Sequence, residues 1–75
     1  MYNIIRSVES SNIPDQIYSA NLTMIYAKIE LSQLAFTWKR NGGEIIEQTE
    51  FIIVVCEEDG SGKIMYFISE IIENN

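Results

Sequence analysis

LAFTWKRNGGEIIEQTEFIIVVC, residues 34 to 56, contains two apolar runs joined by a glycine turn. In the first run Leu34, Phe36 and Trp38 alternate with smaller or polar residues, which is the period of a strand that buries one face. The dipeptide Asn41-Gly42 can adopt the positive φ values that a tight hairpin turn requires. The stretch therefore predicts a β-hairpin at the centre of the fold.

The second run, residues 51 to 56, has six apolar residues in succession. A strand with this composition needs cover on both faces, because its side chains point alternately to either side. One face belongs to the core and the other requires a partner. We expect Ile52, Val54 and Cys56 to share a face and to form a dimer interface.

The chain of 75 residues predicts a single domain over residues 1–75. A core of this size contributes only ~3–5 kcal/mol of stability, so association of two copies is expected to help. The single cysteine, Cys56, rules out an internal disulfide and suits a reducing compartment. The start of the chain lacks the pattern of a secretion signal, and no apolar run is long enough to span a membrane. A soluble, cytoplasmic protein with no membrane contact is expected.

The charge distribution excludes one class of partner. Eleven acidic and five basic residues give a net charge of −6, and a surface of this sign repels nucleic-acid phosphates. We therefore expect no nucleic acid as a partner. The acidic side chains are interpreted as a solvated surface that keeps the domain soluble.

The rest of the chain predicts one helix and further strands. Met1, Ile4, Ile5 and Val8 fit one face of a short helix within residues 1–12. Residues 16–31 fit either a helix or a strand. Apolar and polar residues alternate over residues 23–31, which favours a strand there. This strand is expected to start as early as residue 17. Residues 64–72 also fit either, and the aromatic and β-branched run after a charged turn favours a strand. The predicted fold class is α+β: a short N-terminal helix, then a curved four-stranded antiparallel meander over residues 16–73.

Several segments together resemble the C-terminal sheet of the nuclear transport factor 2-like superfamily, especially its SnoaL-like branch. They are residues 17–23, Ala27-Lys28-Ile29, residues 34–43, Glu47-Gln48-Thr49 and residues 59–64. The resemblance implies a truncated cone-like sheet, and members of the superfamily commonly dimerise through that sheet. The chain departs from the family because the helical half is largely missing and Gly62 stands where the family has a Trp.

The candidate site residues are mostly apolar. There is no histidine, and Glu47 and Glu50 would face opposite ways in a strand, so we expect no catalytic residue, no metal and no cofactor. An apolar pocket for a small ligand is predicted from aromatic side chains that a curved sheet would bring together: Phe36, Trp38, Phe51 and Tyr66. The alternative for these four is packing in the core or in the dimer interface.

Three functions are compatible with these observations. The favoured one is a small non-catalytic domain that forms a homodimer through its sheet and binds an apolar small molecule or a protein partner. The second is an enzyme of the SnoaL or ketosteroid-isomerase kind that acts on a hydrophobic carbonyl compound. The third is a small acidic inhibitor or adaptor outside that superfamily.

Overall fold

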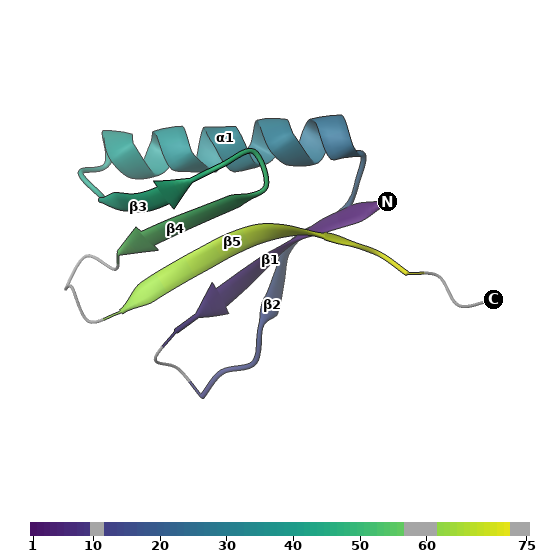
Figure 1. Ribbon diagram of the computed structural model, residues 1–75, viewed down its shortest axis with the longest axis horizontal. Coiled ribbons are helices and arrows are strands. Elements are labelled where there is room, and N and C mark those ends of the chain that lie inside the picture. The colour runs from purple at the N-terminus through teal and green to yellow at the C-terminus, as the bar shows by residue number, and fades with distance from the viewer. Residues whose placement is uncertain (10–11, 57–61, 73–75) are drawn as a thin grey trace.

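A computed structural model describes residues 1–9, 12–56 and 62–72 of the chain. Five strands and one helix follow one another in the order ββαβββ (Figure 1). Their bounds are β1 (Tyr2–Val8), β2 (Gln16–Leu22), α1 (Met24–Arg40), β3 (Ile45–Gln48), β4 (Ile52–Cys56) and β5 (Lys63–Glu70). The class is therefore α+β, as the sequence predicts.

The five strands form one antiparallel sheet in the order β2-β1-β5-β4-β3. The central strand β5 pairs along its length with β1, where Ile4 lies opposite Ile68, and with β4, where Val55 lies opposite Ile64. The first and last strands of the chain are thus neighbours. This pairing ties the N-terminal hairpin to the C-terminal strands.

Helix α1 packs across one face of this sheet and contacts all five strands. Three of its residues, Ala27, Leu31 and Ala35, are at most 2% exposed. From the helix-facing side of the three central strands, five residues complete the core: Ile4, Ile53, Val55, Ile64 and Tyr66 are buried, and Val8 and Ile68 are partly buried against them. Burying an aliphatic side chain of this size stabilises a fold by about 1.5–3 kcal/mol.

Helix α1 has a defined cap at each end. At its start the Thr23 hydroxyl accepts a hydrogen bond from the backbone N–H of Tyr26 at 3.3 Å. At its end the N–H of Gly43 donates to the carbonyl of Trp38 at 2.9 Å, and the N–H of Gly42 donates to that of Lys39 at 3.1 Å. This pair of bonds, with Gly42 at φ 85°, is a Schellman motif.

Three of the predicted elements are wrong. Residues 1–12 do not form a helix, because Tyr2–Val8 is strand β1. Nor do residues 23–31 and 34–39 form strands, since both lie in α1. The glycines that were expected to turn a hairpin instead end this helix, because a residue with positive φ serves either purpose.

The C-terminal strands are confirmed. The run at 51–56 forms β4, and the ambiguous segment 64–72 contains most of strand β5. The predicted four-stranded meander over 16–73 is wrong in strand number and order, because only β3, β4 and β5 are arranged as a meander. The predicted charged turn at 57–62 lies, apart from Gly62, outside the described residues.

Candidate functional site

The sheet has a second face, turned away from α1, which no described helix or strand covers (Figure 1). Strand pairing identifies its residues, since cross-strand partners share a face. Ile52 pairs with Phe67, and Phe67 pairs with Ile5; likewise Val54 pairs with Met65. We call this surface the open face and define it by six half-buried apolar side chains: Ile5, Ile52, Val54, Cys56, Met65 and Phe67.

The predicted interface residues all lie on the open face. Ile52, Val54 and Cys56 alternate with the buried Ile53 and Val55, so the structure confirms that they share one side of β4. Three further residues, Ile5, Met65 and Phe67, were not predicted from the sequence and extend the same surface over β1 and β5. The spacing of two between Met65 and Phe67 is the signal that could have found this pair.

A shallow pocket of about 270 Å³ lies at one end of the open face. Val54 and Met65 contribute its apolar part, while Ser7, Glu9 and Lys63 contribute polar atoms. The open face therefore combines an apolar centre with a carboxylate and an ammonium group at its rim. This combination is typical of a protein interface rather than of a closed ligand cavity.

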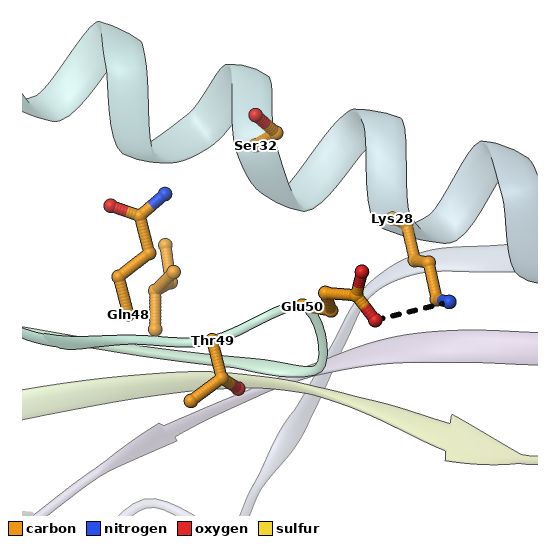
Figure 2. Close-up of a pocket in the computed structure, with 6 residues that line it drawn as sticks. Lys28, Ser32, Gln48, Thr49 and Glu50 are labelled. Carbon is orange, nitrogen blue, oxygen red and sulfur yellow. Dashed lines mark ion pairs between the residues drawn. The ribbon is translucent and has the colours of Figure 1, made fainter.

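A more polar pocket of about 410 Å³ lies on the opposite side of the sheet, between α1 and the turn from β3 to β4. Figure 2 shows that Lys28 and Ser32 come from α1, whereas Gln48, Thr49 and Glu50 come from the end of β3 and the turn. The buried side chain of Ile53 also lines it. The pocket thus joins one element of each layer.

Three of the polar side chains of this pocket, those of Lys28, Thr49 and Glu50, already have partners. Lys28 Nζ lies 3.4 Å from Glu50 Oε2 and 5.0 Å from the ring centroid of Phe51. The Thr49 hydroxyl accepts hydrogen bonds from the N–H groups of Phe51 and Ile52, at 3.2 and 3.1 Å. These contacts hold the turn against the helix. They supply neither a nucleophile paired with a base nor a free charge for a ligand.

The part of the chain that the structure describes has neither a metal-binding cluster nor a membrane-spanning helix. No group of three or more His, Cys, Asp or Glu side chains there is placed to hold a metal ion. In the same part of the chain, no helix has both the length and the apolar character needed to cross a membrane.

The four residues of the predicted apolar pocket lie in different places. Phe36 is 67% exposed, and Trp38, two residues later and so on the other side of α1, packs against the core. Phe51 lies in the turn beneath Lys28, far along the helix from Trp38. Tyr66 is buried at 5% exposure and meets Tyr18 edge to face, with ring centroids 5.3 Å apart. The structure does not bring these four side chains together.

Comparison with known proteins adds no relative. The chain matches no model of a protein family, no curated protein and no solved structure. The resemblance to the nuclear transport factor 2-like superfamily therefore stays a prediction. Two of the segments that resemble its strands, Ala27-Lys28-Ile29 and most of residues 34–43, lie in helix α1.

Proposed function

We propose that this protein is a small non-catalytic interaction domain that forms a homodimer by packing the open faces of two sheets together. The observation that carries the proposal is the open face itself. Six apolar side chains on three adjacent central strands face away from the only helix among the described residues. An apolar surface of this continuity is typical of an interaction site.

The whole sheet face, of which the open face is the apolar centre, is large enough for a small interface with a second copy of the chain. Its strands have 7, 7, 4, 5 and 8 residues, and at about 3.3 Å per residue and about 4.8 Å between strands they cover about 490 Å² before side-chain relief is counted. Two such faces give about 1,000 Å², which is the size of a weak or transient interface rather than of a standard one of about 1,200–2,000 Å². Two twisted sheets pack well when their strands cross at about 30°.

The polar groups at the edge of the open face also suit self-association. Lys63 and Glu9 lie at the same end of the face, with the Glu9 N–H donating to the Lys63 carbonyl at 3.0 Å. Glu47 pairs with Val54 and adds a carboxylate on the side of β3. In a dimer with a two-fold axis, each charged group meets the same group of the second copy or a group next to it. A face that carries both charge signs can therefore place opposite charges against each other.

Sedimentation equilibrium of the wild-type protein and of the Val54→Lys variant tests this proposal. We expect the wild type to be a dimer and the variant a monomer, because the substitution places an ammonium group on the apolar face, where a second copy of the chain would take it out of water. Circular dichroism at the same concentrations checks that the variant is folded. A wild type that remains monomeric at about 1 mM would overturn the proposal, since such a dimer would be worth less than about 4.1 kcal/mol.

A matched control is available on the other side of the molecule. The Ile25→Lys variant adds the same charge and removes the same kind of side chain, but Ile25 is 71% exposed on α1. It should sediment as the wild type does. If both variants dissociate to the same extent, added charge rather than loss of the open face explains the result, and the proposal fails.

A further inference from the structure

One side of helix α1 is turned away from the sheet (Figure 1), and exposed apolar side chains form a second surface there. Ile25, Ile29 and Phe36 are 71%, 46% and 67% exposed. At 100° per residue they fall within a sector of about 40° of the helix, roughly opposite the buried Leu31. We call this line of three side chains the outer ridge. It extends about 16 Å along the helix, from residue 25 to residue 36.

The outer ridge is not explained by folding. The side chains of α1 that are fully buried are two alanines and one leucine, while larger apolar side chains face water. Single exposed apolar residues are ordinary on protein surfaces, but three large ones aligned on one helix indicate a contact surface, here with the polar Ser32 and Gln33 between the second and the third. A convex line with this spacing is the form that enters an apolar groove of a partner.

The charges of α1 indicate what kind of partner fits the ridge. The helix contains three of the five basic residues and only one of the 11 acidic residues, so it carries +2 while the rest of the chain carries −8. Lys39 and Arg40 follow Phe36 by three and four residues and therefore flank it on the next turn. The one acidic residue, Glu30, lies toward the sheet and accepts a hydrogen bond from Ser19 at 3.1 Å.

We infer that the outer ridge docks into an apolar groove of another protein, and that carboxylates of this partner line the end of the groove that receives Lys39 and Arg40. A second copy of the chain does not supply these carboxylates through its own α1, because an antiparallel pair of helices brings Lys39 and Arg40 to a first turn without acidic residues. The inference concerns the opposite side of the molecule from the open face. It holds whether the protein is a monomer or a dimer.

Charge also favours a protein over an anionic membrane. The molecule has a radius of gyration of 12.7 Å, which is comparable with the Debye length of about 8 Å at physiological salt. The electric field of the residues outside α1, whose net charge is −8, therefore reaches in part any surface that the ridge touches. An anionic bilayer is negatively charged over its whole area and repels these residues. A groove in a protein avoids this cost by placing carboxylates only opposite Lys39 and Arg40.

A displayed library of small three-helix proteins, with randomised residues in the groove between two helices, tests the inference when it is panned against the immobilised full-length protein. We expect the enriched grooves to combine apolar and acidic residues. Their affinity should fall at least about tenfold for Ile29→Glu and for Phe36→Glu, and it should also fall for the Lys39→Glu/Arg40→Glu double variant. The control Thr37→Glu adds the same charge to an exposed position about 90° away from the ridge, and it should retain most of the affinity.

Each remaining outcome would overturn the inference. These are a library from which nothing enriches, grooves whose binding is the same for Ile29→Glu, Phe36→Glu and wild type, and enriched grooves without acidic residues. Vesicles of phosphatidylcholine with and without phosphatidylserine are measured in parallel, and ridge-dependent binding to the anionic vesicles would identify a membrane instead. Thermal melts of all variants should match the wild type, because the substituted side chains are exposed.

Discussion

Trp38 and Gly43 show how a single residue sets the end of α1. A Cβ atom on Gly43 would overlap Cδ1 and Nε1 of the Trp38 indole, so only glycine leaves room for this ring against the core. Gly42 is glycine for another reason, since its φ of 85° is unfavourable for residues with a side chain although nothing lies within 4 Å of its Cβ position. Two adjacent glycines thus meet a space requirement and a backbone requirement.

The Gly43→Ala substitution should destabilise the protein by about 1–3 kcal/mol, because the indole of Trp38 must leave its position. Urea unfolding measures this cost. In a Trp38→Phe background the smaller ring frees space, so we expect Gly43→Ala to cost clearly less there. The cost of Gly42→Ala, by comparison, should be about the same in both backgrounds, since it arises from the backbone. If the Trp38→Phe change altered the unfolding free-energy cost of both glycine substitutions by the same amount, this explanation would be wrong.

The residues of the candidate site were predictable where the local structure was predicted correctly. Ile52, Val54 and Cys56 lie on one side because the run around them is a strand, in which alternate residues share a face. The interpretation of Phe36 and Trp38 as wall residues of one pocket failed for the same geometric reason. A separation of two residues places side chains together in a strand but about 200° apart in a helix.

At the scale of elements, α1 is unusual in burying small side chains and exposing large ones. We expect Leu31→Ala to cost about 2–5 kcal/mol of unfolding free energy, because Leu31 is 1% exposed within the core. Ile29→Ala, two residues earlier and 46% exposed, should change stability by less than about 0.5 kcal/mol. Chemical denaturation of the two variants compares them directly. Similar losses for both would show that the ridge is part of the core.

This arrangement also explains why the sequence did not predict α1. Ala27, Leu31, Leu34, Ala35 and Trp38 have the spacing of one helical face, and Thr23 and Gly42 mark its two ends. The exposed Ile25, Ile29 and Phe36 fill the opposite face, so the contrast between an apolar and a polar side is weak. The two-residue alternation typical of a strand was then more evident than the 3.6-residue period of the helix. Apolar residues that serve binding thus obscure the amphipathic pattern that folding alone would leave in the sequence.

The N-terminal strand was missed for a related reason. Strand β1 lies between β2 and β5, so its side chains contribute to both faces of the sheet. Ile4 points to the core and Ile5 to the open face, and two adjacent apolar residues resemble a helical pattern in so short a segment. Which strands become neighbours is decided by pairing between the two ends of the chain. A local pattern does not contain that information.

At the scale of the whole molecule, the open face and the outer ridge lie on opposite sides of a two-layer structure. A dimer formed through the open faces would be a four-layer assembly, helix on sheet on sheet on helix, with an outer ridge on each outside surface. Two ridges on one particle would let the domain engage a partner with two matching grooves far more tightly than a single ridge, provided that the spacing allows both contacts. The open face would then serve dimerisation, and the outer ridge would serve binding of the partner.

The dimer makes a prediction about stability that does not depend on a hydrodynamic measurement. If folding and association are coupled, a hundredfold dilution removes about 2.7 kcal/mol per dimer, which lowers the melting temperature by about 5–10 °C for an assembly of this size. Val54→Lys should melt at a lower temperature, and its melting temperature should not change with concentration. Calorimetric scans over this range of concentrations measure both effects. A wild type whose melting temperature is constant would mean that the buried apolar residues of one chain, eight among those the structure describes, hold the fold together with its strand pairing and without a partner.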